Sequence, residues 1–240
     1  MQEVIRYKTL VISLDKVVIS LGGSILIPGE NDGKFLFGIA ELLKEMSKSY
    51  QIYVVCGGGK VARYYINTAR DMGAVEYDLD TLGIMATRIN AKMLQLALKD
   101  VSNSEIPETV EDASKLGSEG KIVIMGGTIP GHTTDGVSAS LAEAVGAIRI
   151  VNATSVDGVY TADPKKDPQA KKISKMSFSE LNEMLKDGHD AGKSGVFDAM
   201  GADIVMRNHL PLLIVSGRDL EEMKKAISGS SDIKGTIISD

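Results

Sequence analysis

The sequence of 240 residues has little cysteine and little histidine: a single cysteine, Cys56, and three dispersed histidines, His132, His189 and His209. One thiol cannot form an intramolecular disulfide, which fits a protein that works in the reducing cytoplasm. None of the histidines is spaced with the cysteine as zinc ligands are. We therefore expect a cytoplasmic protein with no metal held by its own side chains.

Long apolar runs are also missing. No segment approaches the 18 or so consecutive apolar residues of a membrane-spanning helix. The run 9–14 (TLVISL) is too short for the core of a signal peptide, and no A-x-A-like cleavage site follows it. We expect a soluble protein that is neither exported nor attached to a membrane.

A basic excess is absent as well, because the formal net charge is −5. A general nucleic-acid binder usually shows a basic excess or stripe, so we expect no nucleic-acid partner. A nucleotide is not excluded, since a phosphate site needs only local hydrogen-bond donors. The length allows one large α/β domain or two small ones.

Five short apolar runs rich in β-branched residues are typical of buried strands. They are Val17–Leu21, Ile52–Cys56, Ile122–Met125, Ile148–Val151 and Leu212–Val215. Helical periodicity covers Lys34–Ser49, Lys60–Met72, Thr81–Lys99, Asp135–Val145, Ser179–Lys186, Lys193–Ala202 and Leu220–Ser228. Strands that alternate with helices indicate a mostly parallel sheet covered by helices on both faces, an α/β three-layer sandwich. Residues 102–120 are polar and loosely patterned, and we expect a mobile connection there.

Glycine clusters follow three of the predicted strands: Gly22-Gly23, Gly57-Gly58-Gly59 and Gly126-Gly127. Each cluster alone is compatible with a tight strand-to-helix turn. Because ligands of open α/β sheets bind beyond the carboxyl ends of the strands, the three together favour a backbone that approaches a phosphate-bearing ligand.

The two most familiar phosphate motifs are missing. Residues 188–194 (GHDAGKS) come close to a Walker loop, but the spacer is one residue short and the preceding segment has helical periodicity. No G-x-G-x-x-G follows the first strand, so the dinucleotide fingerprint is absent too.

What remains resembles the amino-acid kinase family and, within it, the archaeal-type uridylate kinases. The resemblance covers residues 15–240 and is carried by five segments. They are 21–24 (LGGS), 56–63 (CGGGKVAR), Asp80 with the helix after it, 126–135 (GGTIPGHTTD) and 157–168 (DGVYTADPKKDP). The last is widespread in the superfamily and marks the ATP side, whereas PGHTTD is narrower and indicates UMP as the acceptor.

The resemblance implies a kinase that transfers the γ-phosphoryl group of ATP to UMP, with Mg²⁺ accompanying ATP. It implies Arg63 and Asp135 as catalytic residues. The residues implied for ATP are Gly23, Ser24, Gly59, Arg63, Thr154, Ser155, Tyr160 and Asp163. Those implied for UMP are Gly58, Asp80, Thr128, Ile129, Pro130, Gly131, His132, Thr133 and Thr134.

Several of these residues also have a plain structural interpretation. Arg63, about one turn into a helix, can reach phosphates with its fork of donors or lie on a solvated face. Thr133 or Thr134 can be an N-cap while its neighbours bind a phosphate. Asp80, just before the helix predicted at 81, is N-cap-like, and only the resemblance assigns it to the UMP ribose.

Phosphoryl transfer to a phosphate needs no general base, because a phosphate monoester has a second pKa near 6 and is already anionic at neutral pH. Repulsion between two polyanions is the obstacle, so positioning and positive charge carry the catalysis. Asp135 is therefore expected to organise the site. Ser20 stands where many relatives have a lysine. The cation beside the γ-phosphate is then left open among Lys60, Lys165, Lys166 and Lys193.

We expect an N-terminal extension over residues 1–14 and one domain over 15–240, with an acceptor half of about 15–146 and an ATP half of about 147–240. The extension repeats an apolar run (VISLDKVVISL), which is either an extra edge strand or translation from an upstream start. The resemblance implies a homohexamer. Two alternatives stay open: a sibling kinase that phosphorylates a carboxylate or carbamate, and a non-catalytic nucleotide-binding regulator.

Overall fold

The computed structural model describes residues 14–29, 32–164, 166–186 and 197–240. The strands are β1 (Asp15–Leu21), β2 (Tyr50–Cys56), β3 (Val123–Met125), β4 (Arg149–Thr154), β5 (Val159–Tyr160), β6 (Lys172–Ile173), β7 (Lys175–Met176), β8 (Leu212–Ser216) and β9 (Thr236–Ile238). The α-helices are α1 (Gly23–Leu26), α2 (Asp32–Met46), α3 (Gly59–Asp71), α4 (Glu76–Leu98), α5 (Val110–Leu116), α6 (Thr134–Val145), α7 (Phe178–Lys186), α9 (Ala199–Arg207) and α10 (Leu220–Ser228).

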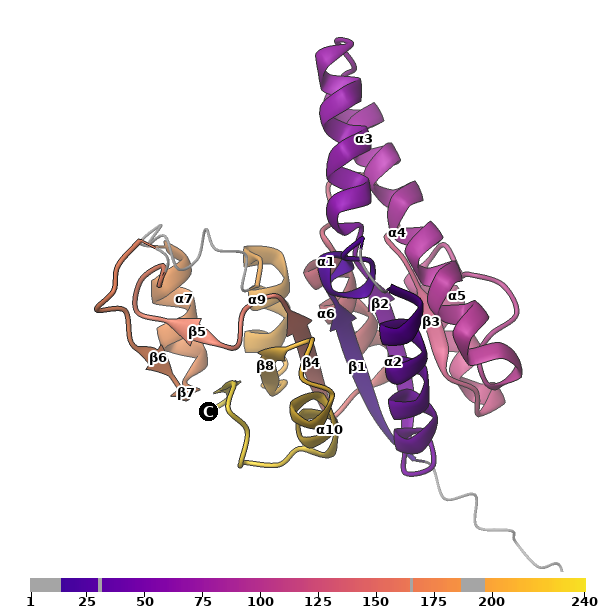
Figure 1. The fold of residues 1–240 in the computed structure, drawn as a ribbon. Helices are drawn as coiled ribbons and strands as arrows, with labels where there is room; N and C mark the ends of the chain where they lie inside the picture. The colour runs from indigo at the N-terminus through magenta and orange to yellow at the C-terminus, as the bar shows by residue number, and fades with distance from the viewer. Residues whose placement is uncertain (1–13, 30–31, 165, 187–196) are drawn as a thin grey trace, which may run out of the picture.

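Seven strands form the central sheet in the order β3-β2-β1-β4-β8-β9-β7 (Figure 1). The first five run parallel, β9 is antiparallel to β8, and β7 is parallel to β9. The five parallel strands overlap the five apolar runs of the sequence, with starts that differ by at most two residues. The runs are continuous because both faces of these strands are buried. The prediction of a mostly parallel sheet is confirmed.

The two faces of the sheet are covered by different helices. Val17 and Ile19 of β1 belong to a core that includes apolar residues of α1, α2, α4 and α10. Val18, which points the other way, belongs to a core with α5, α6, α7 and α9. Successive side chains of a strand alternate between faces, so one buried strand supplies both cores. The three-layer arrangement predicted from the sequence is confirmed.

Two segments differ from the sequence prediction. The helix expected at 81 begins at Glu76, after an extended Val75, so Asp80 lies inside α4 and is not its N-cap. Residues 102–120 are not a plain connection, because they contain α5, capped by Thr109. The buried side chain of Asn103 joins this segment to β3: it accepts from the Ile124 N–H at 2.7 Å and donates to the Ile124 carbonyl at 2.9 Å.

The helix predicted from residue 193 begins at Ala199 in the described part of the chain and runs to Arg207. Asp198 is its N-cap and accepts a hydrogen bond of 2.8 Å from the Gly201 N–H. The N-terminal extension up to residue 13 and the near-Walker segment 188–194 lie outside the described residues.

Candidate active site

A cavity of about 270 Å³ opens where β1, β2 and β4 end, at the carboxyl edge of the parallel strands. It is the place at which an open α/β sheet binds its ligands. The lining residues are Ser20, Gly22, Gly23, Ser24, Ile25, Gly57, Gly58, Gly59, Arg63, Thr134, Asp135, Asn152, Thr154 and Ser155. The fold thus brings together nine of the residues that the sequence placed with ATP, UMP or catalysis: Gly23, Ser24, Gly58, Gly59, Arg63, Thr134, Asp135, Thr154 and Ser155.

The glycine loops after β1 and β2 interlock backbone against backbone. A Cβ on Gly23 would lie 2.3 Å from the Gly57 carbonyl oxygen, and a Cβ on Gly59 would lie 2.3 Å from the Gly23 carbonyl carbon. Gly59 also has φ +61°, a conformation that other residues rarely adopt. These positions therefore require glycine for the contact between the loops, whether or not a phosphate is present.

Asn90 of α4 is hydrogen-bonded to the glycine loop that follows β2. Its buried Nδ2 donates to the Gly57 carbonyl at 2.7 Å and to the Gly58 carbonyl at 3.2 Å. The Gly57 N–H donates to the Leu21 carbonyl at 2.9 Å, so the start of the loop is fixed from both α4 and β1. Sequence reasoning missed Asn90, although a polar residue at a buried position of an amphipathic helix was an available signal.

Arg63 projects from α3 over the mouth of the cavity. Its side chain is exposed, and Nη2 donates to Oγ of Ser24 at 3.0 Å. It is the only cation among the described residues that line the cavity. A guanidinium held beside a hydroxyl and two glycine loops is suited to phosphate oxygens.

Asp135, in the first turn of α6, reaches the cavity next to Ser20 of β1. Ser20 is buried, and its hydroxyl donates to Oδ1 of Asp135 at 2.9 Å. Burial raises the pKa of Asp135 to about 7, assisted by the nearby negative charge of Asp198, although the Ser20 hydrogen bond acts in the opposite direction. Ser20, at the usual lysine position, thus positions a carboxylate.

Asp198 joins the starts of two helices. One carboxylate oxygen accepts from the Gly201 N–H of α9, and the other accepts from the Gly136 N–H of α6 at 2.9 Å and from the Thr133 hydroxyl. Thr133 is itself the N-cap of α6, as one interpretation of the sequence held. Sequence reasoning missed Asp198, because the helix was expected to run through it.

The loop 128–134 lies beside α4. Asp80 accepts a hydrogen bond of 2.7 Å from the Gly131 N–H. Arg88, another residue that the sequence did not single out, donates to the carbonyls of Gly127 and Thr128, both at 3.2 Å. The structure therefore brings Asp80 to the loop that the resemblance assigned to UMP. The members of that set outside the cavity lining are Asp80, Thr128, Ile129, Pro130, Gly131, His132 and Thr133.

The third glycine cluster has a different role from the other two. A Cβ on Gly126 would lie 2.6 Å from Oγ1 of Thr87, and the Gly127 N–H donates to that same oxygen. This pair lets β3 pack closely against α4, and it does not line the cavity. The structure thus gives this cluster a packing role, and its approach to a ligand stays a prediction.

Tyr160 and Asp163 lie beyond the cavity, on and after β5, whereas Thr154 and Ser155 line it. The Tyr160 hydroxyl donates to Asp157 at 2.8 Å, and Lys172 pairs with the same carboxylate at 2.9 Å. The Asp163 carbonyl accepts from the Lys166 N–H.

None of the candidate lysines lines the cavity in the described part of the chain. Lys60 donates to the Pro28 carbonyl at 2.9 Å, and Lys166 is exposed. Lys165 and Lys193 lie outside the described residues.

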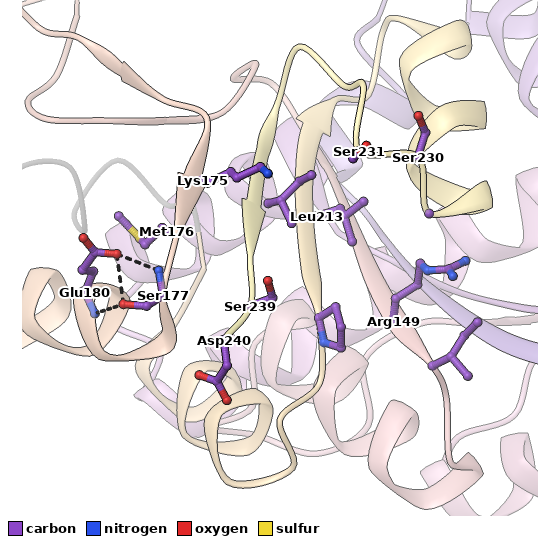
Figure 2. A pocket seen from close by; sticks show the side chains of 14 residues that line it. Arg149, Lys175, Met176, Ser177, Glu180, Leu213, Ser230, Ser231, Ser239 and Asp240 are labelled. Atoms are coloured by element: carbon purple, nitrogen blue, oxygen red, sulfur yellow. Dashed lines mark hydrogen bonds between the residues drawn. The ribbon is translucent and has the colours of Figure 1, made fainter.

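A larger cavity, of about 580 Å³, lies at the opposite edge of the sheet, where β4 and β8 begin (Figure 2). Arg149, Lys175, Glu180 and Asp240 are among its lining residues, so both signs of charge face it. The glycine loops lie at the carboxyl ends of the neighbouring strands β1 and β2. The volume of a cavity therefore does not identify the active site.

Two further properties of the described residues bear on other kinds of site. None of their helices is long and apolar enough to cross a membrane. Over the same residues, no group of three or more histidine, cysteine, aspartate or glutamate side chains is arranged to hold a metal ion.

The sequence model of the Amino acid kinase family matches residues 15–216. The chain is 43% identical to the uridylate kinase of Methanoculleus marisnigri, over 89% of this chain and 92% of that one. It is 44% identical to the uridylate kinase of Methanothrix thermoacetophila, over 90% and 96%. The crystal structure of uridylate kinase from Archaeoglobus fulgidus superposes with a TM-score of 0.84 at 39% identity, covering 93% of this chain and all of that one. The chain belongs to the amino acid kinase family, within which it is similar to the archaeal uridylate kinases.

Proposed function

We propose that this protein is a UMP kinase that transfers the γ-phosphoryl group of ATP to UMP, giving UDP and ADP. The observation that carries the proposal is the cavity at the interlocked glycine loops, with Arg63 over its mouth and Asp135 at its side. The Asp80–Gly131 contact supports it, because it holds the PGHTTD loop against α4, while Thr134 and Asp135 at the end of that segment line the cavity. The uridylate kinase relatives, similar over most of the chain, support the choice of UMP.

The site residues would act through position and charge. Loop N–H groups and the Ser24 hydroxyl donate to phosphate oxygens, while Arg63 offsets the repulsion between the two polyanions. The acceptor phosphate is already ionised at neutral pH and needs no base. Asp135 accepts a hydrogen bond from Ser20 and would thereby fix the first turn of α6, the helix that directly follows the acceptor loop.

Mg²⁺ would enter with ATP and neutralise charge on its phosphates. A hydrated Mg²⁺ held by phosphate oxygens needs no cage of protein side chains. The cavity fits that mode of binding, because it offers N–H groups, hydroxyls, one amide and one carboxylate. Chelation of Mg²⁺ should abolish turnover.

The two nucleotides would approach from opposite sides of the cavity within one domain over residues 15–240. Asp80 and the loop 128–134 come from the acceptor half, 15–146, and Thr154, Ser155, Tyr160 and Asp163 from the ATP half, 147–240. The two phosphates meet between the strand ends, so the nucleosides extend away from each other.

A coupled assay of ADP release with UMP, CMP, dUMP and AMP tests the proposal, with N-acetylglutamate as a carboxylate acceptor. We expect turnover that depends on ATP and Mg²⁺ and is fastest with a pyrimidine monophosphate. Clear turnover with another acceptor, but none with UMP, would show a sibling kinase. Binding of ATP and UMP without ADP release would show a regulator.

We also propose that the protein is a homo-oligomer, with the hexamer as the form that the resemblance implies. The antiparallel pair α3 and α4 projects beyond the sheet (Figure 1). It exposes large apolar side chains: Tyr64, Tyr65, Met72, Tyr77, Met85, Ile89, Met93 and Leu96. Contiguous exposed apolar surface marks an interaction site. Light scattering of the protein and of Ile89→Asp should show a larger assembly that the substitution reduces; a monomeric parent protein would contradict this.

A further inference from the structure

A second cavity, of about 670 Å³, lies beside α2 and the start of α10. It is lined by Pro28, Lys34, Phe35, Gly38, Lys60, Arg218 and Leu220. It shares no lining residue with the cavity at the glycine loops. The function proposed above therefore makes no use of it.

The charged side chains among the described residues that line this cavity are all of one sign. Lys34, Lys60 and Arg218 come from three separate parts of the fold, and no carboxylate is found among the lining residues that the structure describes. Two acidic residues of the described part that lie close to it along the chain have partners elsewhere: Asp32 accepts from the Gly29 N–H at 3.1 Å, and Asp219 pairs with Lys234 at 3.1 Å.

A neighbouring groove on the same face shows the contrast. It also touches Gly38 and Leu220, but two of its three lysines pair with glutamates. Lys44 pairs with Glu41 at 2.8 Å, and Lys224 pairs with Glu45 at 2.7 Å. In a chain with a net charge of −5, a cavity whose described charged residues are three cations concentrates positive potential, which attracts anions.

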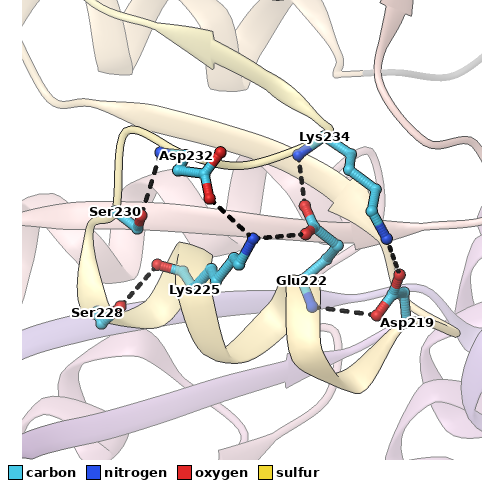
Figure 3. A network of polar contacts seen from close by, with 7 residues as sticks. All are labelled: Asp219, Glu222, Lys225, Ser228, Ser230, Asp232 and Lys234. Carbon is cyan, nitrogen blue, oxygen red and sulfur yellow. Dashed lines mark hydrogen bonds and ion pairs between the residues drawn. The ribbon is translucent and has the colours of Figure 1, made fainter.

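The backbone around Arg218 is held in place by a network at the start of α10 (Figure 3). Asp219 caps the helix by accepting from the Glu222 N–H at 3.1 Å. The buried Glu222 accepts from the Lys234 N–H, and Lys225 lies 3.5 Å from its other oxygen. Arg218 therefore extends from a rigid turn, which reduces the entropy lost when it binds a ligand.

We infer that this cavity is a second ligand site, for a small molecule that carries two or more phosphate groups. Lys34 and Arg218 supply the charge. Phe35 and Leu220 offer an apolar wall for a base or another flat group, so nucleotides and simple polyphosphates share the required chemistry.

Lys60 connects this site to the glycine loops. It directly follows Gly59, and its Nζ is held by the Pro28 carbonyl, at the rim of the second cavity. A phosphate that draws Lys60 away from Pro28 acts on the loop that interlocks with Gly23. The ligand is therefore expected to change the kinetics of the glycine-loop site without entering it.

Titration calorimetry of the full-length protein with inorganic tripolyphosphate tests the site without an activity readout. The parent protein should bind at two sites. The double variant Lys34→Ala/Arg218→Ala should bind as before at the glycine loops. Its affinity at the second cavity should fall at least about thirtyfold, because charged hydrogen bonds to phosphate are strong. Arg63→Ala should weaken binding only at the cavity beside the glycine loops. Lys44→Ala, on the same helix α2 but paired with Glu41, is the matched control and should bind as the parent does.

The same titration with ADP shows whether the ligand of the second cavity is a nucleotide or a simple polyphosphate. Tighter binding of ADP than of pyrophosphate at the site lost in the double variant would show that the apolar wall receives a nucleoside; equal binding would show a polyphosphate site. Unchanged stoichiometry and affinity in Lys34→Ala/Arg218→Ala would overturn the inference. A failure of the UMP kinase assay would leave this binding result untouched, so the two proposals are tested separately.

Discussion

Arg63 makes one hydrogen bond within the protein, to the Ser24 hydroxyl, and is otherwise directed at the cavity. Arg63→Ala should lower kcat/KM by at least about a hundredfold, roughly 2.7 kcal/mol of transition-state stabilisation. The melting temperature should barely change, because the side chain is exposed. Arg70→Ala, at an exposed position of the same helix where the arginine bonds Asn67, should leave both quantities unchanged. An unchanged kcat/KM in Arg63→Ala would mean that Arg63 lies on a solvated helix face and takes no part in catalysis.

Asp135 should make the stability of the ligand-free protein depend on pH. Its pKa rises from 3.8 to about 7 on folding, so between these values the folded chain binds more protons than the unfolded chain. The free energy of unfolding should therefore fall as the pH rises from 4 to 7 and level off above 7.

Asp135→Asn removes this titration. At pH 8 the variant should be more stable than the parent protein by about 2–4 kcal/mol, a difference that shrinks towards pH 4. Urea denaturation without Mg²⁺ or nucleotide measures it. Asp203→Asn, at an exposed position of α9, is the control. Parallel stability profiles for the parent and Asp135→Asn would mean that the carboxylate is ionised in the folded protein throughout this range.

At the scale of whole elements, the contact between the two glycine loops joins the segments that follow β1 and β2. Gly23→Ala places a methyl group 2.3 Å from a backbone oxygen, so a loop must move. We expect a loss of about 2–4 kcal/mol in unfolding free energy together with a loss of activity.

Gly33→Ala in α2 is the matched control for that substitution. A Cβ there meets nothing within 4 Å, and the position is helical. The change should stabilise the protein by about 0.5–1 kcal/mol. Equal effects of the two substitutions in denaturant titrations would mean that the loops yield without cost.

Across the whole molecule, the two-sided arrangement of the nucleotides predicts separable effects on KM. Asp80→Ala should raise KM for UMP severalfold and leave KM for ATP nearly unchanged. It also removes the acceptor of the Gly131 N–H, which loosens the loop. Asp163→Ala should do the reverse, since a lost hydrogen bond to a charged acceptor costs about 1.5–3 kcal/mol.

Steady-state kinetics with each substrate varied in turn measures both constants. Asp78→Ala, an exposed acidic residue in the first turn of α4, is the control for Asp80. If both substitutions shift both constants equally, the nucleosides share one pocket or one coupled closure.

The pattern of consecutive residues was sufficient to predict the overall architecture of this protein. The five parallel strands are short apolar runs because both of their faces are buried, and glycine marks the ends of β1 and β2 because no other residue permits the loops to interlock. Both properties are expressed within a few consecutive residues. Sequence therefore determined the α/β sheet, its covered faces and the place where the cavity lies.

Only the tertiary structure decided how the side chains around the cavity are held. Ser20 and Asp135 are 115 residues apart in the chain, Asn90 bonds a loop 33 residues away, and Asp198 bonds Thr133 across 65 residues. Such partners carry no local periodicity, so nothing in the sequence around either residue indicates the other. The true start of α4 is likewise set by what its first turns pack against, since propensity is a weak guide to helix ends. Burial between β1 and α6, which no single segment contains, is what raises the pKa of Asp135.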